Sequence, residues 1–430
     1  MGPLISRADI GLALADARDR TLAAYDHQPD EKLVVPLLPV INPPLWELGH
    51  IAWFEERWCL RRQIDGNPVP PLRLDADALY DSNAIPHAIR WSLPLPDRSG
   101  TRAYLDAVRA ATLKALKHCD EAALDYFRLA LLHEDMHGEA LLMTLQTLAY
   151  PAPSLQPPPA EATPRAAWSG DAVFDGGEFS MGASRTSGDF VFDNERWSHP
   201  VRVAPFRMAR RCTSNGEFLA FIADGGYRCR ECWDEAGWLW RSNNAAEHPL
   251  YWRRAADGWQ QRRFDRWERL VEEQTLSCIN AHEAEAWCRW AGRRLPSEAE
   301  WEYACRAGQP EGSDAAPWGC RPPSPAEANL DGRWLAPIAV AALPDGATPA
   351  GLLQMLGNVW EWTSTDFAPY PGFVAGPYLE YSTPWFHGHR VLRGGSFATR
   401  SRLVHSRWRN FYPPDRRDVF AGFRSCAANA

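Results

Sequence analysis

The sequence predicts an α+β protein of two domains, a four-helix bundle followed by a domain of short strands, helices and turns. Helical spacing of apolar residues dominates residues 1–150, which form the predicted bundle. The proline-rich stretch PAPSLQPPPAEATPRA fills residues 151–166 and is typical of a stiff interdomain linker. Residues 167–430 are rich in Gly, Trp, Arg and turn signals, so we expect them to form the second domain.

Four predicted helices make up the bundle. The first covers about residues 6–25, where Ala and Leu recur among charges at helical spacing. The second is expected to begin at Pro43 and Pro44, because proline is tolerated in the first turn. Its predicted inner face carries Trp46, His50, Trp53, Phe54 and Arg57. Ser99 is expected to cap the third helix, and the fourth covers about residues 121–150, where a proline stops it.

The second domain shows two helical patches among several strand-like runs. The helical patches begin near Asn280 and Ser297. The strand-like runs are VFDGGEFSMG, HPVRVAPFRMA, HRVLRGGSF and VFAGFRSC. Because these elements do not alternate regularly, we expect an irregular α+β domain and not a parallel βαβ sheet.

Composition and charge exclude several classes of function. The net charge is −8 and there is no long basic run, so we expect no nucleic-acid partner. No stretch approaches 18 apolar residues and no apolar leader opens the chain, so we expect no membrane span and a cytoplasmic protein. Cys229 and Cys232 are the only close pair among 10 cysteines. A zinc ribbon needs a second such pair, so metal or redox use and free loop thiols both remain open.

The segment His133-Glu-Asp-Met-His137 is the strongest chemical signal in the chain. Two histidines four residues apart on a helix point from one face, and imidazole is the commonest metal-binding side chain. His50, on the aromatic face of the second helix, is the best candidate for a third ligand. Three neutral imidazoles leave coordination positions open for substrate and oxygen. Three acidic residues could orient the rings or could form a solvated face: Glu134, Asp135 and Glu139.

The same segment also fits H-E-x-x-H, the pattern of zinc hydrolases in which the Glu acts as general base. The extended form of that pattern is absent, because no Gly-x-x-His follows His137 at the required offset. A zinc hydrolase therefore stays open as an alternative of another class.

Five motifs follow one another in the second domain. They are GGEFSMG at 176–182, RLPSEAEWEYA at 294–304, GNVWEWT at 357–363, RGGSF at 393–397 and AGFR at 421–424. In this order they closely resemble the formylglycine-generating-enzyme-like, or sulfatase-modifying-factor, domain, which implies a C-type-lectin-like core over about residues 168–428. We expect most of these residues to serve packing and turns.

A DinB-like bundle with a His on one helix and H-x-x-x-H on another, placed before such a domain, resembles the ergothioneine-type sulfoxide synthases and the related selenoneine synthases. The resemblance spans nearly the whole chain. It implies a non-haem Fe(II) enzyme that uses O2 to join sulfur or selenium to the imidazole C2 of hercynine. It also implies that the iron ligands are His50, His133 and His137.

The resemblance assigns further roles in the second domain. In Arg-Asn-Phe-Tyr at 409–412, it implies that Asn410 helps to hold the betaine beside Phe411. It implies a catalytic Tyr370 in the Tyr-Pro-Gly-Phe turn at 370–373. A phenol at that position could donate a proton or hydrogen atom, and a turn aromatic that stacks on its proline is the alternative.

Two departures bear on the chalcogen donor. Met136 stands where sulfoxide synthases often have Gln before the second helical His, and a thioether lacks the polar contacts of an amide. The long connection, about residues 64–98, has only Arg90 and Arg98 in its donor region, where enzymes for γ-glutamylcysteine have clustered arginines. A sugar-linked donor needs hydrogen bonds more than fixed cations. The PPLWELGHIAWF helix at 43–54 and the HEDMHGE segment at 133–139 resemble the selenoneine synthase subgroup most, which implies a selenosugar donor.

Three other functions compete with selenoneine synthesis. The first is the sulfur reaction, with γ-glutamylcysteine or cysteine as donor, and the second is the zinc hydrolase. The third is a non-catalytic lectin-like binding module. A formylglycine-type cysteine oxidase is disfavoured, because Cys426 is the only cysteine in the final hundred residues and such copper sites use a pair.

Overall fold

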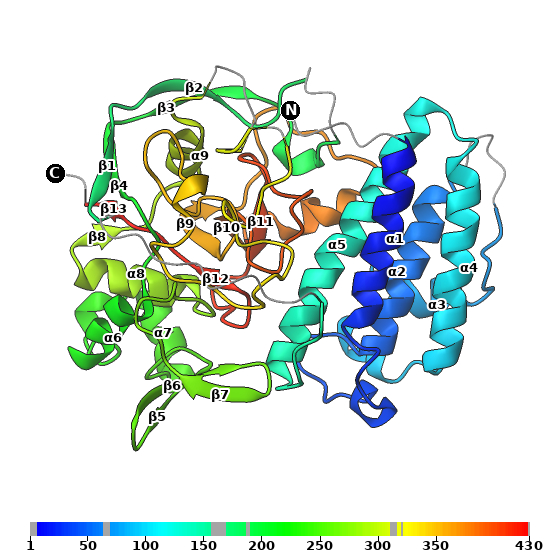
Figure 1. Ribbon diagram of the computed structural model, residues 1–430, viewed down its shortest axis with the longest axis horizontal. Helices are drawn as coiled ribbons and strands as arrows, with labels where there is room; N and C mark the ends of the chain where they lie inside the picture. The colour runs from blue at the N-terminus through cyan, green and yellow to red at the C-terminus, as the bar shows by residue number, and fades with distance from the viewer. Residues whose placement is uncertain are drawn as a thin grey trace. The chain divides into compact units, whose positions relative to one another are not determined.

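The computed structural model describes residues 7–62, 69–155, 169–185, 190–309, 316–319 and 321–428. The chain divides into two compact units, with the boundary between Leu155 and Gln156. The first is helical, and the second combines small sheets with helices (Figure 1). The predicted α+β architecture is therefore confirmed, while residues 156–166 of the predicted linker lie outside the described residues. None of the helices in the described ranges has the length and apolar character needed to cross a membrane.

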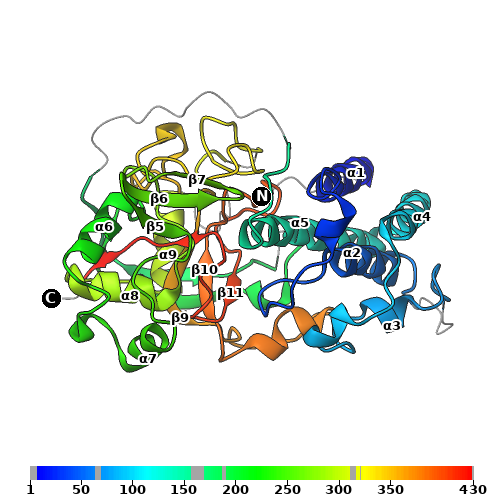
Figure 2. The same ribbon diagram turned by 90° about the horizontal axis from the view of Figure 1, so that it is seen from below.

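In the part of the first unit that the structure describes, there are four long helices: α1 (Arg7–Ala23), α2 (Pro44–Cys59), α4 (Arg98–Leu116) and α5 (Leu124–Thr147). Helix α2 packs against both α4 and α5, and α1 packs against α5. The view in Figure 2 looks nearly down their axes. Ile10, Leu14, Leu116, Phe127 and Leu131 form an apolar core between α1, α4 and α5. The connection from α2 to α4 contains a short helix, α3 (Ala76–Tyr80), and a 3-10 turn at His87–Trp91.

The structure confirms the predicted start of α2 but not the predicted cap of α4. Pro43 caps α2 and Pro44 occupies its first position, as predicted. Ser99 does not cap α4, so that prediction was wrong. Asp97 is the cap, with an extended backbone (ψ 178°) and a carboxylate that accepts from the Gly100 N–H at 2.8 Å. Ser99 already lies inside the first turn, and its hydroxyl donates to Asp97 Oδ1.

Helix α5 is shorter than predicted at both ends. Residues Glu121–Ala123 form a 3-10 turn capped by Asp120, and the α-helix begins at Leu124. It ends at Thr147, two residues before Ala149, which has φ 55°. A left-handed residue cannot continue a right-handed helix, so the backbone stops α5 before Pro151 is reached.

Four small sheets are found in the described residues of the second unit. The first has the order β1-β4-β13-β8, from Asp171–Phe174, Phe206–Ala209, Cys426–Ala427 and Arg293–Arg294. The second has the order β11-β10-β9-β12, from Asn410–Tyr412, Arg390–Arg393, Trp360–Asp366 and Ala421–Gly422. β2 (Gly177–Met181) pairs with β3 (His199–Val203). A three-stranded meander that was not predicted joins β5 (Trp252–Ala255), β6 (Gly258–Arg263) and β7 (Arg266–Arg269).

Helices α6 (Asn215–Ala223), α7 (Glu235–Asn243), α8 (Ala281–Trp290) and α9 (Glu298–Arg306) accompany these sheets. The predicted helices near Asn280 and Ser297 are present as α8 and α9. Each begins with a capping box, in which the cap side chain and the Glu three residues later bond to each other's backbone N–H groups. The helix starts are therefore fixed by local sequence.

The motifs of the second unit form its buried framework. Trp360 and Trp362 of GNVWEWT are fully buried on β9. Glu361 between them accepts from Trp301 Nε1 at 2.9 Å and from Arg424 Nε at 2.6 Å. The motifs at 294–304, 357–363 and 421–424 are thus joined by one buried carboxylate. This agrees with the structural role predicted for most of them.

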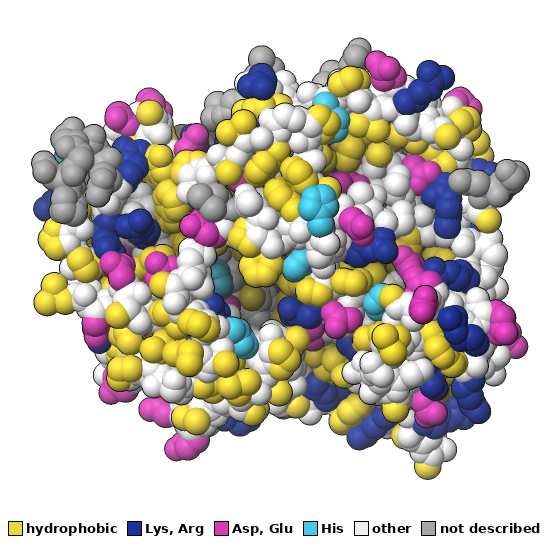
Figure 3. Space-filling view, turned by 180° about the vertical axis from the view of Figure 1, so that it is seen from behind, with side chains coloured by type: hydrophobic (Ala, Val, Ile, Leu, Met, Phe, Trp, Pro, Cys, Tyr) yellow, Lys and Arg dark blue, Asp and Glu magenta, His cyan; other side chains and the backbone are white. Residues whose placement is uncertain are grey.

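Acidic and basic side chains are interspersed over the described part of the face in Figure 3, in keeping with the modest net charge of −8.

Candidate metal centre in the helical bundle

The three predicted metal ligands converge inside the bundle. His50 comes from α2, and His133 and His137 come from successive turns of α5. One ring nitrogen from each lies within 4.8 Å of the other two. The ring centroids are 5.2 Å apart for His50 and His133, and 4.5 Å apart for His133 and His137. Imidazole is a ligand suited to iron, zinc, copper and nickel, so this cluster has the chemistry of a transition-metal site.

A backbone carbonyl sets the tautomer of His50. Its Nδ1 donates to the carbonyl of Tyr80 at 2.8 Å, which leaves Nε2 as the nitrogen with a lone pair. Gly49 makes this approach possible, because a Cβ there would meet the Tyr80 ring at 2.2 Å. The glycine beside the ligand is therefore needed for α3 to lie against α2.

A buried carboxylate sets the orientation of His137. Glu47, only 2% exposed, accepts from His137 Nδ1 at 2.8 Å. Metal-bound histidines commonly donate their second N–H to a carboxylate, which fixes the ring and raises its basicity. Glu47 was not predicted from the sequence. Its position three residues before His50, on the same face of α2, is the signal that could have found it.

Burial keeps two of the three imidazoles, His50 and His133, uncharged. Burial, and then the neighbouring His137, lower the pKa of His50 to about 3. Burial also lowers the pKa of His133 well below its usual value. His50 stacks on Trp46, and His133 stacks on Phe54 with centroids 3.5 Å apart. Both imidazoles are therefore neutral near pH 7, which is the state that binds a metal.

Glu134, the candidate general base of the H-E-x-x-H pattern, belongs to a buried ion-pair network. Its Oε1 accepts from Arg18 Nε at 2.8 Å, and its Oε2 accepts from Arg109 Nη2 at 2.6 Å. Both arginines also pair with Glu55. Each long helix thus supplies one charge. Since two guanidinium groups hold this carboxylate, the geometry disfavours proton abstraction by Glu134 and with it the hydrolase alternative.

Asp135 and Glu139, the other two acidic residues that could orient the histidine rings, are buried on the same helix. The described contact to His137 comes from Glu47 on α2 instead.

The predicted substrate residues of the bundle lie near the cluster. Arg90 places its guanidinium 3.9 Å from the ring centroid of Trp46, the residue that stacks on His50. Arg90 Nη1 donates to Asn42 Oδ1 at 2.7 Å, and burial lowers the pKa of Arg90. Met136 is half-buried directly before His137. Their roles in substrate binding stay predictions.

The remaining predicted residues belong to the second unit. Tyr370 is 6% exposed, and its hydroxyl lies 3.4 Å from Glu298 Oε1. Arg409 lies over its ring at 4.1 Å from the centroid. Phe411 stacks on Phe367 with centroids 4.0 Å apart. Tyr370 is thus tightly packed, as the stacked-aromatic alternative also expects, and its catalytic role stays a prediction.

Asn410, half-buried on the edge strand β11, uses Oδ1 to accept from the Phe411 N–H. Cys229 is half-buried and Cys232 is buried, and both are free thiols. Neither belongs to a group of three potential ligands among the described residues. A role for Asn410 in binding the betaine stays a prediction.

Comparison with known proteins matches both units to families. Residues 158–430 match the family described as "Sulfatase-modifying factor enzyme 1-like domain", and residues 13–150 match the DinB superfamily. The fold and these matches define a class in which a DinB-type bundle precedes a sulfatase-modifying-factor-like domain. A hercynine oxygenase of Mycolicibacterium thermoresistibile is 39% identical, over 97% of this chain and 94% of that protein. Another, from Mycobacterium tuberculosis, is 38% identical, over 98% of this chain and 99% of that protein.

A formylglycine-generating enzyme of Streptomyces coelicolor is 31% identical, over 65% of this chain and 95% of that protein. That match is confined to part of the chain, whereas the hercynine oxygenases align with nearly all of it. The chain belongs to the family of the hercynine oxygenases.

Proposed function

We propose that this protein is an Fe(II)- and O2-dependent enzyme that joins selenium from a selenosugar to the imidazole C2 of hercynine. The observation that carries the proposal is the cluster of His50, His133 and His137, in a chain that aligns over 97% of its length with a hercynine oxygenase. The name of that relative supports hercynine as the acceptor substrate. The cluster supports metal-dependent oxidation.

The donor set of the cluster fits ferrous iron. Three imidazoles provide a firm but incomplete ligand set, which leaves positions for substrate and oxygen. Ferrous iron, when bound, supplies the activation of O2 that amino-acid side chains cannot provide. Glu47 and the Tyr80 carbonyl hold two of the rings in the required tautomer. The aromatic walls made by Trp46 and Phe54 exclude water from the ring faces.

Asn410 and Phe411 are the proposed recognition groups for the betaine. An amide N–H can donate to the carboxylate of hercynine. The faces of aromatic rings attract a trimethylammonium group. Tyr370 is the proposed proton or hydrogen donor.

The two arginines of the predicted donor region, Arg90 in the connection before α4 and Arg98 at the start of α4, favour a donor without several carboxylates. Arg98 Nε pairs with Asp30 at 2.6 Å, and its other nitrogens donate to the carbonyls of Tyr25 and Gln28. Arg90 is partly engaged by Asn42 and Trp46. One of the two arginines is therefore already neutralised within the bundle. γ-Glutamylcysteine, with two carboxylates, would meet few cations here.

The sulfur reaction, with γ-glutamylcysteine or cysteine as donor, is the second candidate, since membership of the hercynine oxygenase family is compatible with either chalcogen. A competition experiment separates the two. The protein is loaded with Fe(II) without oxygen and mixed with hercynine, equal amounts of selenosugar and thiol, and then O2. We expect mass spectrometry to find the selenium product in excess. Preferential formation of the sulfur product would overturn the selenosugar assignment while leaving the hercynine assignment intact.

A further inference from the structure

A second group of metal-binding side chains lies in the other compact unit, between α7 and α8. It consists of Asp234, His282 and Glu285, and one ligand atom from each lies within 4.8 Å of the other two. We propose that these three residues bind a divalent cation, Zn²⁺, independently of the three-histidine cluster. The site shares no residue with the proposed iron centre, so a test of this site is independent of the proposed function.

Helix geometry holds the three side chains in place. His282 and Glu285 are three residues apart on α8 and so project from one face. The capping box of Asn280 fixes the start of that helix. Asp234 is the cap of α7, where its Oδ1 accepts from the Gly237 N–H at 2.7 Å. The capping bond occupies Oδ1 and orients the side chain, so Oδ2, which has a long contact of 3.4 Å with Arg289 Nη2, is the oxygen that would act as a ligand.

The two carboxylates lie close together and are incompletely neutralised. Arg289 Nη2 lies 3.4 Å from Asp234 and 3.5 Å from Glu285, and Arg390 Nη2 lies 3.5 Å from Glu285. In contrast, the buried arginine–glutamate contacts of the bundle are 2.6–2.9 Å long. Burial, together with the charge of Asp234, raises the pKa of Glu285, although Arg390 opposes this. A divalent cation would relieve the repulsion between the carboxylates.

The charges around His282 also permit a cation. Asp234 and Asp415 act on the ring as negative neighbours, and Arg390 and Arg289 act as positive ones. Burial is the main influence and lowers the pKa of His282, so the imidazole is available in its neutral form. Arg289 is exposed and can turn away into solvent when a cation binds.

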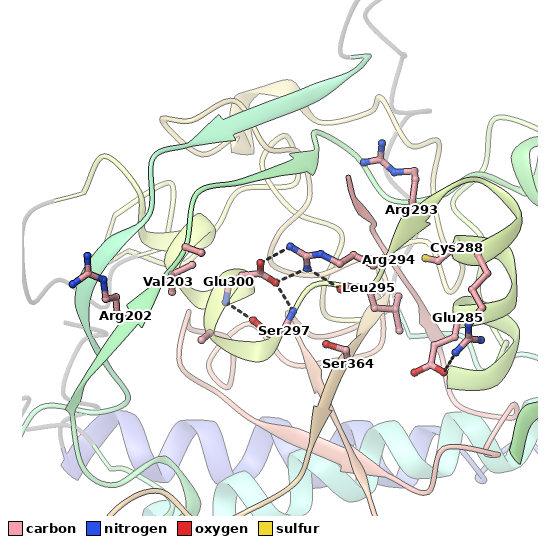
Figure 4. A pocket seen from close by; sticks show the side chains of 13 residues that line it. Arg202, Val203, Glu285, Cys288, Arg293, Arg294, Leu295, Ser297, Glu300 and Ser364 are labelled. Atoms are coloured by element: carbon pink, nitrogen blue, oxygen red, sulfur yellow. Dashed lines mark hydrogen bonds and ion pairs between the residues drawn. The ribbon is translucent and has the colours of Figure 1, made fainter. Parts of the chain in front are cut away.

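The site has a route to solvent. Asp234, His282 and Glu285 are each half-buried. Glu285 and Arg289 also line a cavity of about 440 Å³, together with Cys288 of α8. Figure 4 shows Glu285 and Cys288 at the α8 end of this cavity, away from the pair formed by Arg294 and Glu300. One imidazole and two carboxylates make a three-ligand set that zinc accepts, with a remaining position for water.

The test must first remove the other metal site. The full chain carrying both His133→Ala and His137→Ala serves as the background, and Zn²⁺ is measured by equilibrium dialysis and metal analysis. We expect one Zn²⁺ per chain in this background and none after His282→Ala is added. His248→Ala is the matched control, because His248 is a half-buried histidine of the same unit outside the cluster, and we expect it to retain the ion.

Two further variants protect the test against misfolding. Glu285→Gln keeps the side-chain shape, and we expect at least tenfold weaker Zn²⁺ binding with an unchanged circular dichroism spectrum. Arg289→Met removes the competing guanidinium, and we expect several-fold tighter binding. Absence of Zn²⁺ from the background protein, or equal binding before and after His282→Ala, would overturn the proposal.

Discussion

The Nδ1 atom of His137 lies 2.8 Å from Oε1 of Glu47, and this partly buried contact joins the two helices that carry the histidine cluster. Glu47 lies on α2 one turn before His50, so a single helix supplies one proposed ligand and the group that orients another. The orientation of His137 therefore depends on the packing of α2 against α5.

Glu47→Ala should weaken Fe(II) binding without removing a ligand. We expect a loss of about 10–100-fold in affinity, because groups that orient metal ligands typically contribute that much. Glu47→Gln should lose less, since the amide oxygen can still accept from Nδ1. Anaerobic Fe(II) titration against a competing chelator measures the effect. The exposed Glu31→Gln is the control, and equal affinities for all three variants and the wild type would contradict the assigned role.

Glu134→Gln should destabilise the bundle while leaving its metal site in place. The substitution leaves Arg18 and Arg109 with one buried carboxylate, Glu55, and breaking a buried ion pair costs about 3–5 kcal/mol. Urea unfolding followed by circular dichroism measures the loss. Asp125→Asn on the exposed side of the same helix breaks a surface pair with Arg128 and should cost about 1 kcal/mol or less.

The same Glu134 variant also separates the oxygenase from a zinc hydrolase. We expect it to bind Fe(II) with wild-type stoichiometry, because Glu134 orients none of the three rings in the described contacts. Hydrolysis of a peptide or ester by the zinc-loaded wild type, abolished by Glu134→Gln, would instead establish the hydrolase.

The metal-free protein should lose stability as the pH falls below about 6.5, the ordinary pKa of histidine. His50 has a folded-state pKa of about 3, so between these values the unfolded chain binds a proton that the folded chain does not. Through this residue, each unit by which the pH is lowered in this range therefore decreases the free energy of unfolding by about 1.4 kcal/mol. His133, whose pKa is also lowered, adds to the slope.

Denaturant unfolding between pH 6.5 and pH 5, with chelator present, tests this pH dependence. His50→Gln should reduce the slope by about 1.4 kcal/mol per pH unit. His118→Gln, at an exposed position, should leave it unchanged. An undiminished slope in His50→Gln would show that the imidazole is not buried in its neutral form.

Tyr370→Phe tests the catalytic prediction in the second unit. We expect turnover of hercynine to fall by about a hundredfold or more, since general acid catalysis contributes about 10²–10⁴-fold. Stability should change little, because the ring keeps its contact with Arg409 and the hydroxyl contact to Glu298 is long at 3.4 Å. Tyr303→Phe, which removes a 2.7 Å bond to the Gly176 carbonyl, is the structural control. Full turnover by Tyr370→Phe would make Tyr370 a packing residue.

Local sequence signals predicted a helix start correctly where no neighbouring residue competes to begin the helix. Prolines at 43 and 44 marked the start of α2, and helical patches near 280 and 297 marked α8 and α9, whose starts the structure shows to be capping boxes. Ser99 failed as a cap because Asp97, two residues earlier, competes for the same backbone N–H groups. The end of α5 was misplaced because a left-handed Ala149 has no signature in the sequence.

The histidines of the candidate site could be predicted, but their supporting contacts could not. The spacing of His133 and His137 places both on one helix face from sequence alone. Glu47 and the Tyr80 carbonyl are joined to the cluster only by the packing of α2 against α5 and α3, which are far apart in the chain. The acidic residues of α5 were predicted as possible orienting groups instead, but one of them, Glu134, pairs with arginines in a buried network.

X-ray absorption spectroscopy of the Fe(II)-loaded protein tests whether His50, His133 and His137 bind one iron together. We expect three histidine nitrogens in the iron coordination sphere of the wild type and two in His50→Ala, with hercynine oxidation lost in the variant. An unchanged coordination sphere in His50→Ala, or hercynine oxidation that continues without iron, would contradict it.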